Sequence, residues 1–145
     1  MPLDVAVASK SLTSTLHYLE RGTERPARYR IEPPPGVPLR DVFQSQGFID
    51  HYTPPPCIEA LGVALGGSPI GPLLEPLDGF ALAGRPPLEA PVTKNLGERT
   101  VVFHQYPAAA GSDGHFVDFD DPDARRQSVD FLATLAAEGV ATLVP

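Results

Sequence analysis

The sequence predicts an α/β protein with a mostly parallel sheet, flanking helices and long connections rich in proline and glycine. Two segments typical of strands, residues 39–46 and 100–106, are each followed by a polar loop and later by a segment with helical spacing. Strands that alternate with helices are typical of parallel sheets. The chain has 145 residues, which suits one domain with a substantial core. We expect a single domain over 1–145, with a poorly defined segment at 1–38 and two strand–helix units within 39–145.

Composition and charge narrow the class of protein. Hydrophobic residues make up 42% of the chain and charged residues 20%, as in ordinary soluble globular proteins. The formal net charge of −7 argues against nucleic acid as a partner, because binding phosphates needs a basic surface. No apolar run is long enough to span a membrane, and the first residues lack the pattern of a secretory signal. These observations predict a soluble chain and leave its compartment open.

Proline is unusually frequent, with 18 residues beside 13 glycines. The two residue types cluster around 33–38, 53–57, 66–72 and 84–91. We interpret the segments between the clusters as ordered elements joined by stiff, irregular connections, of which 66–98 is the longest. Loops of this length often carry function.

The elements expected before the first proline cluster are short. Residues 3–8 form a brief apolar run. Ser11 is a typical helix N-cap, and the helix after it would end at Gly22, with leucines at helical spacing (Leu12, Leu16 and Leu19). Residues 28–32 have an extended pattern, which the following prolines interrupt.

The first strand–helix unit begins with the strand at 39–46, centred on Val42 and Phe43. Gly47 is expected to open the loop that follows it. After a run of prolines, a helix is indicated by apolar residues on one face, and glycines mark its end. These apolar residues are Ile58, Leu61 and Leu65. Cys57, the single cysteine, excludes an internal disulfide and is interpreted as a small packing residue.

The second unit contains the most distinct element of the sequence. The strand at 100–106 is rich in β-branched and aromatic residues, and a loop of small residues follows it. A helix is predicted over 122–138, with Asp121 as N-cap, Pro122 in the first turn and Gly139 as terminator. Its apolar face would contain Val129, Leu132, Leu135 and Ala136.

Asp50 and His115 are the residues with the clearest chemical potential. Each lies in a loop directly after a predicted strand. Because the carboxyl ends of neighbouring parallel strands meet at one edge of a sheet, we expect the two side chains within hydrogen-bonding distance. An aspartate that accepts a hydrogen bond from a histidine fixes the imidazole tautomer and stabilises the imidazolium. The spacing alone leaves open an exposed loop aspartate and an unrelated loop histidine.

The same residues resemble the C-terminal part of serine α/β-hydrolases, most closely the large bacterial esterase-like and lipase-like members. The resemblance covers about 39–138 and is carried by QSQGFIDHYTPPPCIEAL, VVFHQYP and GSDGHFVDFDDPDARRQSVDFLATL. In that fold the catalytic acid precedes the catalytic histidine along the chain, and a final helix packs back on the sheet. The resemblance therefore implies Asp50 as the acid and His115 as the histidine. His51 and Tyr52 flank the acid and could line the substrate site.

The sequence lacks the G-x-S-x-G nucleophile motif of that family. Residues 66–71 miss the spacing by one position, and 110–114 give A-x-S-x-G around Ser112. A nucleophile elbow needs a strand before it and a helix straight after it, whereas no helix is expected after Ser112 before Pro122. We therefore expect an incomplete hydrolase-like domain. It would supply the acid and histidine of a carboxylic-ester hydrolase and be inactive without a serine carried by an upstream or separate part.

Two other hypotheses stay open. A hydrolase-derived module that binds a partner or a small ligand, without catalysis, would explain the missing elbow. A metal-dependent enzyme is favoured least, because the spacing of its candidate ligands fits no known motif. Those candidates are His51, His104, His115 and Asp118.

The remaining polar residues have simpler interpretations. His104 is expected as a hydrogen-bonded histidine within a strand, and His17 as a surface residue. The acidic run at Asp118, Asp120, Asp121 and Asp123 lacks the glycine and glutamate of a calcium loop and is better explained by helix capping. We expect no cofactor and no metal. The expected partners are an ester-like or lipid-like substrate and either the serine-bearing part or a second copy of the chain.

Overall fold

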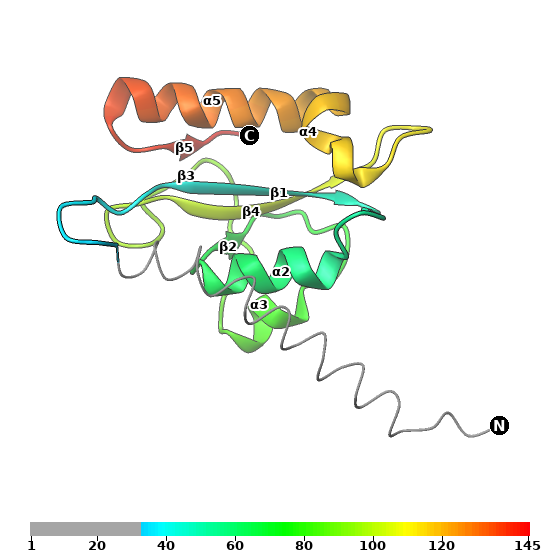
Figure 1. Ribbon diagram of the computed structural model, residues 1–145, viewed down its shortest axis with the longest axis horizontal. Coiled ribbons are helices and arrows are strands. Elements are labelled where there is room, and N and C mark those ends of the chain that lie inside the picture. The colour runs from blue at the N-terminus through cyan, green and yellow to red at the C-terminus, as the bar shows by residue number, and fades with distance from the viewer. Residues whose placement is uncertain (1–32) are drawn as a thin grey trace.

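The computed structural model describes residues 33–145. The elements predicted at 3–8, 11–22 and 28–32, and the surface position predicted for His17, lie outside this range. Within it, a three-stranded parallel sheet lies between α5 on one face and α2 with α3 on the other (Figure 1). The predicted α/β class is confirmed at this level: a small parallel sheet with flanking helices.

The sheet is built around strand β4 (Val101–Pro107). Strand β1 (Val42–Phe48) pairs with it in parallel along its whole length, with Val42 opposite Val101 and Phe48 opposite Pro107. The short strand β2 (Ser68–Pro69) pairs in parallel with the other side of β4. The strand order is therefore β1-β4-β2, and no described strand pairs with the outer edge of β1.

The other elements cover the two faces of this sheet. Helix α2 (Pro55–Ala64) and the short α3 (Asp78–Leu82) lie on one face, and α5 (Pro122–Glu138) lies on the other, preceded by the 3-10 turn Gly114–Phe116 and by α4 (Val117–Asp120). A separate antiparallel pair, β3 (Val92–Thr93) with β5 (Thr142–Leu143), ties the long central connection to the end of the chain. None of the described helices is long and apolar enough to cross a membrane.

Helix α5 has the predicted boundaries and a different packing face. Asp121 caps it, since its side chain accepts a hydrogen bond from Ala124 N at 2.8 Å, and Gly139 ends it in the left-handed region at φ 75°. The predicted apolar face is wrong for Val129 and Leu132, which are 59% and 63% exposed, and for the exposed Ala136, whereas Leu135 packs against the core as predicted. The helix instead buries Phe131, whose ring centroid lies 5.6 Å from that of Phe43 in β1. The aromatic contact sets the rotation of the helix about its axis.

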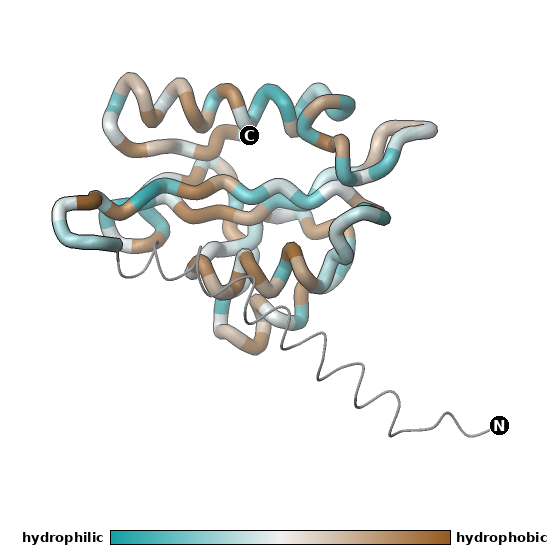
Figure 2. The backbone as a smooth tube through the Cα atoms, in the orientation of Figure 1, coloured by the Kyte–Doolittle hydropathy of each residue, from teal (hydrophilic) through white to brown (hydrophobic). Residues whose placement is uncertain are grey.

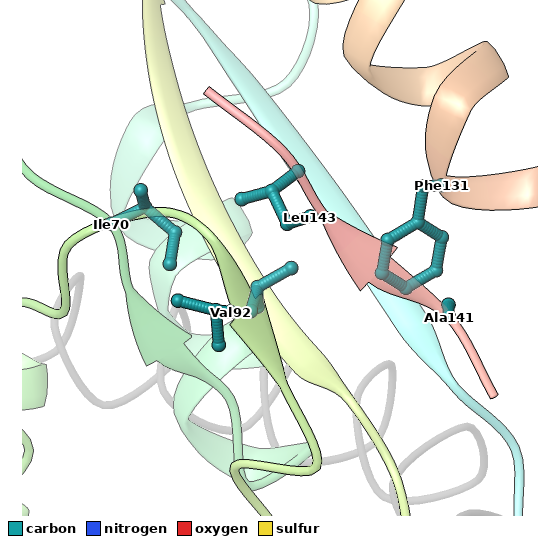
Figure 3. Packing of buried hydrophobic residues seen from close by; sticks show 6 residues of the cluster. Ile70, Val92, Phe131, Ala141 and Leu143 are labelled. Atoms are coloured by element: carbon teal, nitrogen blue, oxygen red, sulfur yellow. The ribbon is translucent and has the colours of Figure 1, made fainter. Parts of the chain in front are cut away.

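Hydrophobic side chains fill both interfaces of the sheet. Figure 2 shows hydrophobic stretches along the two long strands and at intervals along α2 and α5. Beneath α5, the helix, β3, β4, β5 and the residue that follows β2 contribute side chains to one cluster, which consists of Ile70, Val92, Val102, Phe131, Ala141 and Leu143. All of these except Val102 are labelled in Figure 3. On the opposite face Phe80 packs against Phe103, with ring centroids 4.9 Å apart.

Three expectations about the chain path are corrected. The first strand starts at Val42 instead of 39, because the Asp41 side chain accepts from Thr100 N at 2.7 Å and binds Arg99 at 3.1 Å. Gly47 continues that strand instead of opening a loop. The connection 66–98, expected to be irregular, contributes β2, α3 and β3.

The outer edge of β1 generates a prediction about association. The strand contains no charged residue and no proline, the features that usually protect an exposed edge. Beside it lies a shallow groove with apolar walls that include Phe43, Phe131 and the exposed Leu132. We expect concentration-dependent self-association in sedimentation experiments. Leu132→Lys should weaken it about tenfold, since a charge in an apolar contact is costly.

The matched control for this prediction is Ala137→Lys, which adds the same charge to another exposed position of α5. This control should leave association unchanged. A monodisperse monomer at every concentration would contradict the prediction.

Candidate functional site

Asp50 lies just beyond the end of β1 and is 6% exposed. Its Oδ1 accepts hydrogen bonds from the backbone N–H groups of Tyr52 and Thr53, both at 2.7 Å. This turn is one that aspartate favours, because its side chain can bond the backbone a few residues on. The two bonds fix the carboxylate and leave Oδ2 free for another partner.

That partner is His115, which lies in the 3-10 turn after β4. Its Nδ1 is 3.2 Å from Asp50 Oδ2, so the predicted proximity of the two side chains is confirmed. Because the carboxylate oxygen accepts, Nδ1 carries the hydrogen, and in the neutral imidazole Nε2 keeps its lone pair. No described residue bonds Nε2, and the side chain is 41% exposed. The arrangement can therefore take a proton from a group that approaches Nε2.

Two glycines allow the loops to meet at this distance. A Cβ on Gly47 would lie 2.7 Å from Gly114 Cα, and a Cβ on Gly114 would lie 2.8 Å from the carbonyl carbon of Ile49. The backbones are joined by a hydrogen bond from Gly114 N to Ile49 O at 2.9 Å. Neither position has room for a side chain, so the close approach of the loops depends on glycine in both.

A second aspartate–histidine pair joins the same loops, with its aspartate in the loop after β4 and its histidine in the loop after β1. Asp113 Oδ2 lies 2.6 Å from His51 Nδ1, and Asp113 Oδ1 accepts from the N–H groups of His115 at 2.9 Å and His51 at 3.2 Å. The N–H of His115 is the main reason that the pKa of Asp113 lies below its usual range, and His51 adds to the effect. This role of Asp113 was not predicted from the sequence, although an acid two residues before a loop histidine is the signal for such a turn.

Aromatic rings border the His115 imidazole. The Tyr52 ring lies 4.8 Å from it between centroids, and the Phe116 ring lies 5.1 Å from it, edge to face. Of the two residues expected to line a substrate site, Tyr52 therefore lies against the histidine. His51 is held by Asp113, with its side chain 74% exposed. Phe116 belongs to the site by contact and was not singled out in the sequence.

Ser112 is not placed as a nucleophile elbow would be. It lies in the loop beyond β4, and its hydroxyl donates to the carboxylate of Asp120. The expectation that no helix follows it before Pro122 is wrong, since the 3-10 turn and α4 come first. No strand directly precedes it, however, so the strand–turn–helix geometry is incomplete. Ser68 opens β2 and accepts a hydrogen bond from Asn95 at 3.1 Å.

The other polar residues have structural partners. His104 is hydrogen-bonded within β4, as predicted, with Nδ1 3.0 Å from Gln127 Oε1. The proposed metal ligands are not brought together, and no group of three potential ligands gathers within residues 33–145. Asp118 accepts from Ser45 at 2.7 Å. Cys57 is a free, partly buried residue of α2.

The fold and the site together define a class: an α/β protein with an aspartate–histidine pair at the carboxyl edge of two adjacent parallel strands. Comparison of the chain with family models, curated proteins and solved structures finds no match.

The close approach of the two loops at Gly47 and Gly114 can be tested by adding one methyl group. Gly114→Ala should lower the free energy of unfolding by about 1–3 kcal/mol, because the new Cβ meets backbone that cannot move aside. Gly79→Ala is the matched control, since its Cβ would find only an ordinary contact with Val63. Urea denaturation should show the control unchanged or slightly more stable. Equal stability of the two variants would contradict the conclusion that the close approach of the loops depends on glycine.

The contacts of Asp113 predict a pH effect with a defined sign. A lowered pKa means that the ionised carboxylate stabilises the folded state above the usual aspartate pKa. This contribution is lost as the pH falls through the lowered value. A carbon-detected NMR titration should find the Asp113 pKa below the usual range. His51→Ala should raise this pKa part of the way back, because the His115 N–H remains. A titration unchanged by His51→Ala would contradict the assigned pairing.

Proposed function

We propose that this chain supplies the acid and histidine of a serine-type carboxylic-ester hydrolase. The observation that carries the proposal is the hydrogen bond between Asp50 and His115, which joins the loops at the carboxyl ends of two paired parallel strands. Ligands of open parallel sheets bind at this edge. The resemblance of the surrounding sequence to serine α/β-hydrolases gives the same roles to the same two residues.

In this mechanism His115 Nε2 takes the proton of an attacking serine hydroxyl and later returns it to the leaving alcohol. Asp50 holds the imidazole in the Nδ1–H tautomer and stabilises the imidazolium that forms. Three features support these roles: the burial of Asp50, the two backbone bonds on its Oδ1, and the free Nε2 of His115. The apolar rings of Tyr52 and Phe116 would shield the reacting atoms from water on one side.

The serine must come from elsewhere than the described loops. The sequence contains no G-x-S-x-G, and the hydroxyl of Ser112 is bonded to Asp120. We therefore assign the nucleophile to a strand–turn–helix elbow carried by another polypeptide segment. The two strands of this chain would align with it if it joined the same parallel sheet.

The missing motif also favours a second candidate, a non-catalytic binding module derived from such a hydrolase. In that case the exposed imidazole of His115 and its neighbouring rings would contact a ligand without catalysing a reaction. The two candidates differ in whether a serine-bearing segment restores hydrolysis.

The chain alone should give no hydrolysis of short p-nitrophenyl esters above background and no labelling by a fluorophosphonate. The reason is that an acid–histidine pair activates a nucleophile and cannot replace one, and a single missing oxyanion donor costs about 10²–10³ in rate. Labelling that Ser112→Ala removes and Ser68→Ala leaves intact would overturn this assignment of the nucleophile.

Complementation separates the two candidates. Co-expression with the polypeptide encoded directly upstream, where it contains G-x-S-x-G, should restore esterase activity. Asp50→Asn and His115→Ala should each abolish the restored activity, while the matched surface change Asp123→Asn should not. Nitrogen NMR of the chain alone should find His115 protonated at Nδ1, and Asp50→Asn should disturb this tautomer. Absence of activity in every combination would favour the binding module.

A further inference from the structure

A cavity of about 580 Å³ lies at the edge of β4 opposite β1. Its lining shares no residue with the Asp50–His115 site. It has apolar walls that include Ile70, Pro72 and Leu88, and its polar groups include the side chains of His104 and Gln127. Ile70 also belongs to the core cluster beneath α5, so this wall is anchored in the packed interior (Figure 3).

The cavity follows from the shortness of β2. This strand has two residues, and the last bond of its course is from Ile70 N to Phe103 O at 2.8 Å. The chain then continues through Gly71 and Pro72, which both line the cavity. Beyond Phe103, no described strand pairs with β4 on that side. The cavity lies on this side of β4, lined by His104 of the strand and Gln127 of α5.

The hydrogen bonds of His104 fix which of its nitrogens can meet a ligand. Gln127 Nε2 donates to Val144 O at 2.8 Å, which orients the amide so that its Oε1 faces the strand. The Tyr106 hydroxyl donates to this oxygen, and burial raises the pKa of Tyr106, so the hydroxyl keeps its proton. His104 Nδ1 lies 3.0 Å from the same oxygen and 3.1 Å from the Tyr106 hydroxyl, whose single proton is already donated to Gln127. Because the amide oxygen can only accept, Nδ1 carries the hydrogen and Nε2 holds a lone pair.

Nε2 of His104 makes no hydrogen bond with any residue of the described range. Burial lowers the pKa of His104, so the ring is neutral at pH 7. Because His104 lines the cavity, its unbonded Nε2 is the acceptor that the ring can offer there, within mainly apolar walls. This combination, an apolar pocket of 300–1,000 Å³ with a few placed polar groups, is typical of small-molecule sites.

We propose that this cavity is a binding site for a small neutral molecule with an apolar body and one N–H or O–H group that donates to Nε2 of His104. The acceptor lone pair and the carboxylate of Glu89, which also lines the cavity, both disfavour an anion. The apolar walls disfavour a buried charge of either sign. The site is separate from the Asp50–His115 pair and does not rest on the function proposed for that pair.

Indole and benzofuran test the proposal, because they have the same bicyclic shape and only indole carries an N–H donor. In a titration followed by NMR, indole should shift the signals of Leu88 and Ala90 and bind about tenfold more tightly than benzofuran. It should also shift the Nε2 resonance of His104, which benzofuran should leave in place. This last measurement uses the unaltered protein, so it does not depend on the folding of a variant.

Two variants locate the interaction. His104→Phe keeps a flat ring and removes the acceptor, so the preference for indole should disappear. Tyr52→Ala alters the aromatic rings beside His115 and should leave the affinity for indole unchanged. The proposal is overturned by any of these results: no shifts at the cavity, equal binding of the two molecules, a preference that survives His104→Phe, or loss of binding in Tyr52→Ala.

Discussion

The contact between Gly47 and Gly114 is the constraint on which the site depends. The first glycine is the penultimate residue of β1, and the second opens the 3-10 turn after β4. Since neither has a side chain, the two backbones come close enough for Gly114 N to bond Ile49 O. Asp50 and His115, each adjacent in sequence to one partner of that bond, are then within hydrogen-bonding distance. Parallel pairing of the strands brings the loops to one edge of the sheet. Because the two glycines have no side chains, the loops can then come into backbone contact.

The two aspartate–histidine pairs that bridge these loops differ in burial, and this difference separates their roles. Asp50 is buried, with backbone donors on one oxygen and His115 on the other, so its geometry is set before any ligand arrives. Asp113 is 20% exposed, its partner His51 is 74% exposed, and Asp113 bonds the backbone of both loops. Its contacts hold the loops together. A base that acts on a substrate needs the first kind of environment, which supports assigning the chemistry to His115.

Strand β4 separates two histidines with unlike surroundings. His115 follows the strand and meets solvent at the carboxyl edge of the sheet. His104 lies within the strand, where α5 and its Gln127 hold one nitrogen and the cavity beside β2 leaves the other free. Burial keeps the His104 ring neutral, so it is suited to accepting a hydrogen bond and poorly suited to holding a proton. The same residue type thus has an unbonded Nε2 that meets solvent at one position and a partly buried ring beside a cavity at the other.

The sequence by itself determined the elements whose signals are local. The boundaries of α5 follow from the Asp121 cap, Pro122 and Gly139, and the parallel pairing of β1 with β4 follows from the alternation of strands and helices. The position of each residue in a loop directly after a predicted parallel strand was enough to predict that Asp50 lies near His115. The resemblance to serine hydrolases, which assigns roles to these residues, remains a proposal.

Tertiary structure decided what depends on contacts between distant residues. The rotation of α5 follows the contact of Phe131 with Phe43, which helical spacing alone does not specify. Segments far apart in the chain also meet at the hydrogen-bonded pair of His51 and Asp113 and at the cavity beside His104. β2 was missed because two residues in a proline-rich connection give no periodic signal, and only pairing with β4 makes them a strand. Local propensity marks where elements begin and end, whereas packing decides which of their faces are buried.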